Sequence, residues 1–128
     1  MLDHVSLGVA DFDRSQAFYD AVLATLGMKR YFNYPGAAGY GATQDRPVFW
    51  IGRPSDADRP PQAGGGSHLA FVAKDRPAVD AFHAAALAAG GRDNGAPGLR
   101  PLYHPNYYGA FVFDPDGHKI EACCRQPA

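Results

Sequence analysis

The stretch Phe111–Cys124, FVFDPDGHKIEACC, contains the residues that decide the fold. Its centre, Asp114-Pro115-Asp116-Gly117, has Asp, Pro and Gly where a type I turn prefers them, so the stretch predicts two strands joined by a tight turn. In the second strand Glu121 has apolar neighbours on both faces, which indicates that its carboxylate is partly buried. A buried carboxylate needs a positive partner, hydrogen-bond donors or a metal ion, and we expect the rest of the chain to supply it.

Further strands and two helices are predicted on either side of this stretch. One helix is expected after Asp11 or Asp13 and ends at Gly27, and a second is expected after Asp75 and ends at Gly90-Gly91. Alternation and β-branched content predict strands near residues 2–10, 29–34, 39–43, 47–52, 67–73, 106–113 and 118–124. Residues 92–105 resemble a loop with room for one short strand that the pattern does not place.

An internal repeat organises these elements. A shift of 64 residues superimposes three pairs of residues, namely His4 and His68, Phe18 and Phe82, and Gly27 and Gly91. The last strands of the two halves align by their turns with an offset of 71, which places Trp50 opposite Glu121. The repeat predicts one α+β domain of two βαβββ modules, with module one at residues 1–52, a polar Pro- and Gly-rich linker at 53–66 and module two at 67–124.

Composition narrows the class of protein. A chain of 128 residues with a net charge of −1 gives no electrostatic reason to bind nucleic acid or an anionic membrane. No apolar run approaches the roughly 18 residues of a membrane span. The first strand begins near Leu2, so we expect no signal or transit peptide. The adjacent Cys123 and Cys124 favour reduced thiols over a disulfide framework, and we expect a cytoplasmic protein.

Four short stretches carry a family resemblance: LDHV at 2–5, LGM at 26–28, GSHLAF at 66–71 and FDPDGHKIE at 113–121. Through them the chain resembles the vicinal oxygen chelate superfamily, which includes glyoxalases, extradiol dioxygenases and bleomycin-resistance proteins. The resemblance extends over nearly the whole chain. It implies that the two modules form an open, cup-shaped mixed sheet, often completed in a dimer, with a divalent metal in the cup. We therefore expect a glyoxalase-like fold and a homodimer.

The resemblance implies that His4, His68 and Glu121 are the ligands of one divalent metal ion, namely Zn, Fe, Mn or Ni. Imidazole and carboxylate groups suit these metals, and three protein ligands leave positions open for substrate or water. The alternative is that each histidine is an ordinary core or surface residue, but their equivalent places in the two halves favour a metal site. Glyoxalase I sites usually have a fourth ligand, Glu or Gln, where this chain has Trp50. Isomerisation of methylglyoxal with glutathione is therefore not expected, whereas two histidines and one carboxylate are typical of Fe(II) oxygenases.

Other side chains are candidates for the lining of the cup. We expect His104 and Tyr108 to act as acid or base, and Trp50, Tyr107 and Tyr31 to contact a substrate, the alternative being that these aromatic residues pack within the core. Any of four arginines could bind an anionic group of the substrate, and the sequence singles out none of them: Arg30, Arg46, Arg53 and Arg100. His83 and His118 are expected to be solvated.

These features predict a metal-dependent glyoxalase-like lyase, isomerase or transferase that acts on a small substrate with vicinal oxygens. An extradiol-type Fe(II) dioxygenase is an alternative, weakened because the chain is shorter than most such enzymes. A metal-free, drug-binding protein of the bleomycin-resistance type is the alternative from another class. That branch commonly lacks the ligand triad that this chain retains.

Overall fold

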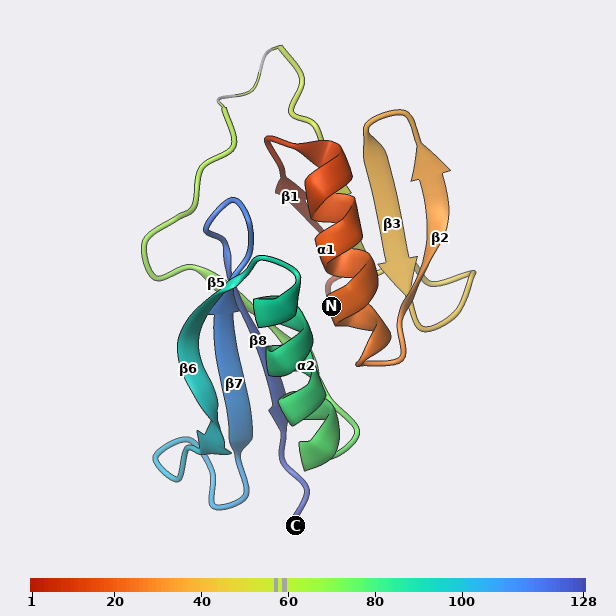
Figure 1. Cartoon of the computed structure of the whole chain (residues 1–128). Coiled ribbons are helices and arrows are strands. Elements are labelled where there is room, and N and C mark those ends of the chain that lie inside the picture. Colours follow the sequence, from red (N-terminus) through yellow and green to blue (C-terminus); the bar gives the residue numbers. More distant parts are fainter. Residues whose placement is uncertain (57, 59) are drawn as a thin grey trace.

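The structure is a computed structural model that describes residues 1–56, 58 and 60–128. Its elements follow in the order β1 (Val5–Gly8), α1 (Phe12–Ala24), β2 (Lys29–Tyr34), β3 (Ala37–Gly41), β4 (Phe49–Gly52), β5 (His68–Val72), α2 (Arg76–Ala88), β6 (Arg92–Leu99), β7 (Tyr108–Phe113) and β8 (Lys119–Cys124). Each half of this list reads βαβββ. The predicted α+β fold of two such modules is therefore confirmed (Figure 1).

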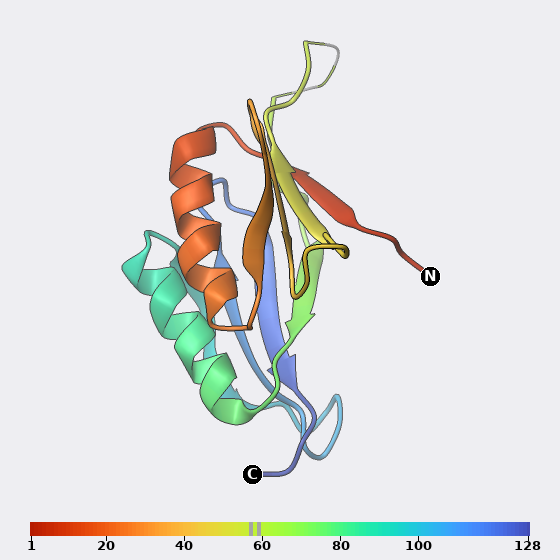
Figure 2. The ribbon, with the colours of Figure 1, turned by 90° about the vertical axis from the view of Figure 1, so that its right-hand side faces the viewer.

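Each module forms its own four-stranded mixed sheet. The strand order is β1-β4-β3-β2 in module one and β5-β8-β7-β6 in module two. The first and last strands of each module pair in parallel, and the remaining neighbours are antiparallel. Both helices lie on the same side of the two sheets, and no helix among the described residues covers the other side (Figure 2). The predicted cup thus consists of two open sheets, each curved around its own helix.

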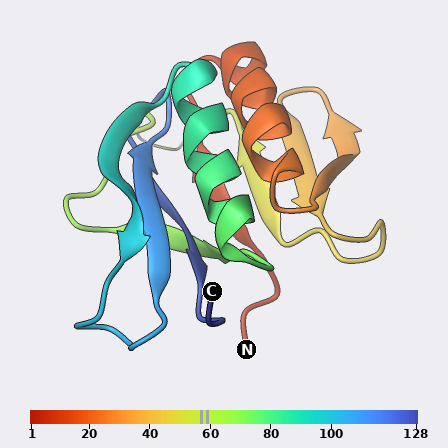
Figure 3. The same cartoon turned by 60° about the horizontal axis from the view of Figure 1, so that its bottom comes forward.

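The two helices begin and end at the residues that capping chemistry favours. Asp11 accepts a hydrogen bond from the amide of Arg14 at 3.1 Å, and Asp75 caps α2 in the same way. Gly27 and Gly90 follow the helices with φ values of 79° and 98°, a left-handed conformation that only glycine adopts at low cost. Each helix has 13 residues, and the helices lie side by side across the two modules (Figure 3).

One hydrophobic core spans both modules. Phe18, Tyr19 and Phe82 lie between the helices and the sheets with almost no exposure, and the ring of Phe49 in β4 meets that of Phe71 in β5 edge to face at 5.3 Å. Two apolar residues of the helices, Ala21 of α1 and Leu87 of α2, lie outside this core and are exposed. The buried face of each helix is formed by residues three or four positions apart, as in Phe18 and Val22 of α1 and Phe82 and Ala86 of α2.

The region 92–105 contains the long strand β6, which the sequence pattern does not place. Its residues Gly95, Pro97 and Gly98 disfavour strand structure, and the pairing of β6 with β7 shifts register around them. The strand lies at the edge of its sheet. There the missing N–H group of Pro97 can face away from β7, so no backbone hydrogen bond of the sheet is lost. Position in the sheet therefore overrides local propensity here.

The pairing registers confirm the internal repeat down to single residues. Ser6 of β1 pairs with Trp50 of β4, and Ala70 of β5 pairs with Glu121 of β8. Because Ser6 and Ala70 are 64 residues apart, Trp50 holds in module one the place that Glu121 holds in module two. The aromatic residue therefore replaces a carboxylate at the equivalent position of the first sheet.

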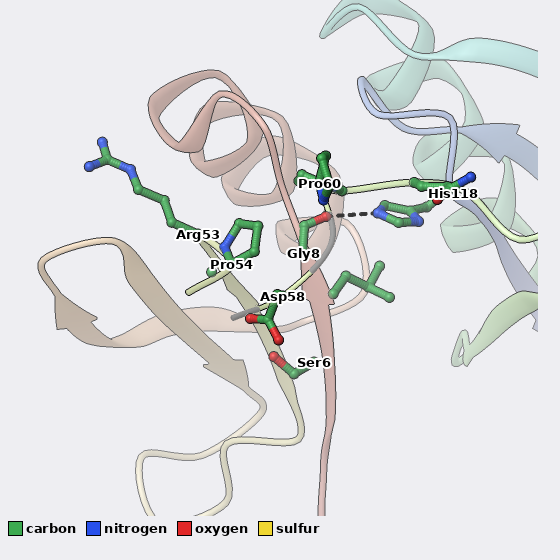
Figure 4. A pocket seen from close by; sticks show the side chains of 11 residues that line it. Ser6, Gly8, Arg53, Pro54, Asp58, Pro60 and His118 are labelled. Carbon is green, nitrogen blue, oxygen red and sulfur yellow. Dashed lines mark hydrogen bonds between the residues drawn. The ribbon is translucent and has the colours of Figure 1, made fainter. Parts of the chain in front are cut away.

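The Asp114–Gly117 turn of module two attaches to module one. The carboxylate of Asp116 accepts a hydrogen bond from the Ala10 amide at 3.0 Å, and Arg14 donates to the Pro115 carbonyl at 2.7 Å. The imidazole of His118 lies 2.9 Å from the carbonyl of Gly8 and donates to it (Figure 4). His118 is partly exposed, so it is less solvated than the sequence predicts, because its imidazole is bound to module one.

His83 is also less solvated than its sequence context indicates. Its side chain is 12% exposed and lies 2.8 Å from the carboxylate of Asp93 on β6. This contact joins α2 to the edge of the second sheet. The contact stabilises the ionised form of Asp93, because the hydrogen bond with His83 lowers the pKa of this carboxyl group.

Candidate functional site

Glu121 is a buried carboxylate on the open side of the second sheet. Its side chain is 2% exposed, which confirms the prediction of burial from its apolar neighbours. The adjacent strand leaves room for it at Gly109, where a Cβ atom would lie 3.2 Å from Glu121 Oε2 and 3.2 Å from Tyr107 Cε1. Any larger residue at that position would push these two side chains away from the strand.

Two side chains contact the Glu121 carboxylate. Tyr107 donates its hydroxyl proton to Oε2, and His68 Nε2 lies 3.3 Å from Oε1. Burial raises the pKa of Tyr107 strongly, and the contacts with Cys123 and Glu121 raise it further. Tyr107 therefore remains a neutral phenol and donates a hydrogen bond to the carboxylate at neutral pH. The carboxylate thus has one oxygen bound to a phenol and the other directed at an imidazole.

These three residues line an open cavity of about 590 Å³. The volume is in the range of small-molecule sites. The remaining walls come from β6, β7, the loop between them and the start of β8, and they comprise Asn94, Gly95, Arg100, Tyr103, Phe111 and Lys119. The cavity therefore combines a buried acid, an imidazole and a phenol with two cationic side chains.

Module one presents an aromatic surface at the equivalent place. Trp50 lies over Gly39, where a Cβ atom would approach the indole to 2.8 Å. Phe32 and Tyr34 flank the indole with ring centroids at 5.7 and 6.2 Å, and His4 meets it edge-on at 6.5 Å. His4 is half exposed, and its Nδ1 lies 2.7 Å from the carboxylate of Asp3. The Nε2 atom of His4 is therefore directed by Asp3 as a potential ligand.

The structure brings together some of the predicted site residues. His68, Glu121 and Tyr107 share one cavity, whereas His4 lies with Trp50 on the other sheet. Within the described part of the chain, His4 does not join His68 and Glu121 in a group of close ligand atoms. The three predicted metal ligands thus form a pair and a single histidine on separate modules.

The tyrosine at the carboxylate is Tyr107, and the assignment of Tyr108 as acid or base is corrected. Tyr108 lies on the opposite face of β7, where its hydroxyl donates to Asp80 of α2 at 2.6 Å. His104 accepts a hydrogen bond from the Asn106 amide in the loop and does not line the cavity of the second sheet. Tyr31 lies in β2, and the rings beside Trp50 are those of its neighbours Phe32 and Tyr34. Successive side chains of a strand point to opposite faces, so Tyr107 shares a face with Phe111 and Tyr108 does not. This alternation is the sequence signal that distinguishes the two tyrosines.

A second group of possible metal ligands lies in the Asp114–Gly117 turn. Asp114, Asp116 and His118 each offer one ligand atom within 4.8 Å of the others. Their donors and acceptors are already used: Asp114 accepts from Tyr19 and from two turn amides, and Asp116 and His118 bond to module one. These hydrogen bonds show that the three side chains connect the two modules. A hollow of about 350 Å³ beside it is lined by β1, His118 and part of the 53–66 connection (Figure 4).

The donor atoms at Glu121 fit a divalent metal ion. Two ligands at about 2.1 Å from a tetrahedral ion are about 3.4 Å apart, and His68 Nε2 and Glu121 Oε1 are 3.3 Å apart. Tyr107 occupies the other carboxylate oxygen and so fixes the orientation of the carboxylate, as hydrogen-bond partners of metal ligands commonly do. The spacing of the pair thus matches that of two ligands of one ion.

Comparison with known proteins identifies the family. The family model of the Glyoxalase/Bleomycin resistance protein/Dioxygenase superfamily matches residues 1–122. The chain belongs to this superfamily. It is 38% identical to a glyoxalase/bleomycin resistance protein from Albidiferax ferrireducens T118, whose crystal structure superimposes with a TM-score of 0.87 over 97% of this chain and 98% of the other. It is also 29% identical to the "Probable lactoylglutathione lyase" of Synechocystis sp., over 92% of this chain and 90% of that protein.

More distant superfamily members confirm the fold alone. A lactoylglutathione lyase from Agrobacterium tumefaciens, 21% identical, aligns with a TM-score of 0.65 over 97% of this chain and 92% of the other. The enzymes of the glyoxalase family act on small-molecule substrates. Neither helix in the described part of this superfamily member is long and apolar enough to cross a membrane.

Proposed function

We propose that the chain is a metal-dependent, glyoxalase-like lyase, isomerase or transferase that acts on a small substrate with two adjacent oxygens. One observation carries the proposal: a carboxylate that is 2% exposed lies 3.3 Å from an imidazole, and both groups line a cavity of about 590 Å³. A buried carboxylate with only a phenol and an imidazole as partners is costly unless a cation completes its surroundings.

His68 and Glu121 would hold the ion, with His4 as the third protein ligand. Because His4 lies on the first sheet and the other two on the second, His4 would come from module one of a second copy. The proposal therefore includes a homodimer in which the open side of each first sheet faces the second sheet of its partner. When bound, the ion would act as a Lewis acid that stabilises negative charge on a substrate oxygen.

Tyr107 and Trp50 have separate roles in this proposal. Tyr107 stays protonated, since burial raises its pKa, and its hydroxyl would orient the Glu121 carboxylate that holds the ion. Trp50, with Phe32 and Tyr34, would form the apolar wall opposite. Trp50 replaces a carboxylate at its position, so the chain has no acid there to move a proton between carbons. This favours a lyase or transferase over a glyoxalase I isomerase.

The second candidate is a metal-free binding protein that sequesters an aromatic compound in the cup. The aromatic surface around Trp50 favours it, because flat rings bind such compounds by stacking. Such a protein would retain ligand affinity without any metal. A cytoplasmic location is part of both proposals and is supported by the free thiols of Cys123 and Cys124.

Elemental analysis of the purified, untagged protein tests the first candidate. We expect about one Zn, Fe, Mn or Ni per chain after incubation with each ion, and loss of this metal in His68→Ala and Glu121→Ala. The matched control is Asp116→Asn, which alters the other cluster of possible ligands and should leave metal content unchanged. Metal that survives in both site variants and disappears in the control would refute the assignment. A parent protein that binds no ion at all would favour the binding protein.

A further inference from the structure

Two cationic side chains converge on one aromatic ring at the edge of the cavity. The guanidinium carbon of Arg100 lies 5.6 Å from the centroid of the Phe111 ring, and Lys119 Nζ lies 5.0 Å from the same centroid. Arg100 follows β6 and Lys119 begins β8, so the two cations approach Phe111 of β7 from opposite neighbouring strands. Of the four arginines that the sequence leaves open, Arg100 is the one that lines the cavity beside Glu121.

The backbone holds the Arg100 guanidinium in place. Nη2 donates to the Ala96 carbonyl at 2.9 Å, and Nη1 donates to the Leu99 carbonyl at 3.5 Å. A Cβ atom at Gly98 would lie 3.1 Å from Nη1, and one at Gly95 would lie 3.4 Å from Nη2. The two glycines that weaken β6 as a strand thus provide the space in which the guanidinium lies. Its remaining donors are free of backbone partners among the described residues.

Neither cation is neutralised by the protein. In the described part of the chain, neither Arg100 nor Lys119 forms an ion pair with a carboxylate. The one carboxylate in the cavity, that of Glu121, is engaged by Tyr107 and His68 instead. Two like charges held on one ring repel each other unless an anion lies near both, and a guanidinium with a fixed orientation is suited to bind a carboxylate or phosphate through two hydrogen bonds.

We infer that the site takes an anionic small molecule, whose carboxylate or phosphate group is bound by Arg100 and Lys119 across Phe111. The inference rests on the proposed function in that it assigns the substrate class of the same cavity. The reacting part of the molecule would then extend from the anion towards Glu121, His68 and Tyr107. Arg100 and Lys119 are specificity-determining residues in this arrangement, since they would recognise the charge of the molecule at Phe111, which pairs with Glu121 across the two strands.

Titration of EDTA-treated protein tests this inference independently of any metal. The probes are glycolate, a carboxylate with one adjacent oxygen, and inorganic phosphate, each added at constant ionic strength while amide signals of ¹⁵N-labelled protein are recorded. We expect saturable shifts of the Asn94, Gly95 and Gly98 amides. Arg100→Gln and Lys119→Gln should each raise the dissociation constant about tenfold or more, with the spread of amide signals retained as evidence of folding. Tighter binding of one probe identifies the anion as carboxylate or phosphate.

Arg92→Gln is the matched control. Arg92 lies on β6 and stacks on Phe113 at 5.0 Å, as Arg100 stacks on Phe111, but it is outside the cavity. Its loss should leave the dissociation constants unchanged. No saturable shift with either probe, or equal weakening by Arg92→Gln and Arg100→Gln, would overturn the inference. Because no metal is present in this titration, its failure would leave the metal assignment standing, and failure of the metal assay would leave this result standing.

Discussion

Removing a single buried hydroxyl, in Tyr19→Phe, is expected to destabilise the whole chain. Tyr19 of α1 donates to Asp114 Oδ2 at 2.6 Å, across 95 residues and between the two modules. Tyr19 is fully buried and Asp114 is 3% exposed, so water does not replace the lost donor. An unsatisfied buried partner costs about 1–3 kcal/mol, and a charged one costs more than a neutral one. We therefore expect the free energy of unfolding to fall by about 2–3 kcal/mol at pH 7.

The pH dependence of this loss has a definite sign. Burial raises the pKa of Asp114, and the hydrogen bond from Tyr19 opposes that rise. Without the hydroxyl the pKa of folded Asp114 should rise further, so the folded protein holds the proton more tightly. The stability contributed by this group is then lost as pH rises from the ordinary pKa towards the raised one. The penalty of Tyr19→Phe should thus be greatest at pH 7 and should shrink towards pH ~4.

Urea denaturation followed by circular dichroism at both pH values measures the effect. Tyr40→Phe is the control, because the Tyr40 hydroxyl is also bound to a carboxylate, but Asp20 is 37% exposed and water can replace the donor. The control should cost less than Tyr19→Phe. A loss below about 0.5 kcal/mol for Tyr19→Phe at pH 7, within the scatter of surface substitutions, would refute the argument that this bond joins the modules.

Three further substitutions test other parts of the fold. Gly39→Ala should displace the indole of Trp50, which lies 2.8 Å from the added Cβ, and shift the fluorescence of the one tryptophan in the chain. His83→Gln should lower the melting temperature at neutral pH and have no effect at strongly acid pH, since the lowered pKa of Asp93 stabilises only while that group is ionised. Phe82→Ala, at a fully buried position, should cost about 3–5 kcal/mol in chemical denaturation.

The sequence predicts the order of helices and strands because the signals for them lie within a few residues of each element and occur in both halves of the repeat. These signals are the capping residues, the glycines that follow the helices and the Asp114–Gly117 turn. Because the two halves show the same pattern, the assignment of elements in one half supports the assignment in the other. The burial of Glu121 follows from its apolar neighbours. The strand β6 is not predictable in this way, because Gly95, Pro97 and Gly98 serve the edge position and the Arg100 side chain rather than strand propensity.

The composition of the site is harder to predict than its existence. Alternation separates the faces of the adjacent Tyr107 and Tyr108, but which of these faces carries Glu121 depends on the pairing of Phe111 with Glu121. The contact of His118 with Gly8 spans 110 residues and has no local signal. The position of the Arg100 side chain also has no local signal in the sequence. It depends on Gly95, Gly98 and the ring of Phe111, which the pairing of β6 with β7 brings together.

Neither half of the repeat can complete its core alone. Phe18 of module one approaches the position of Gly91 in module two so closely that a Cβ atom there would lie 3.0 Å from its ring, and Phe49 rests against Phe71. An excised half would expose these rings to water, where they favour aggregation. The duplicated pattern therefore does not make two independent folding units. The chain should fold and unfold in a single cooperative step, and a protease cut that releases one half should unfold both.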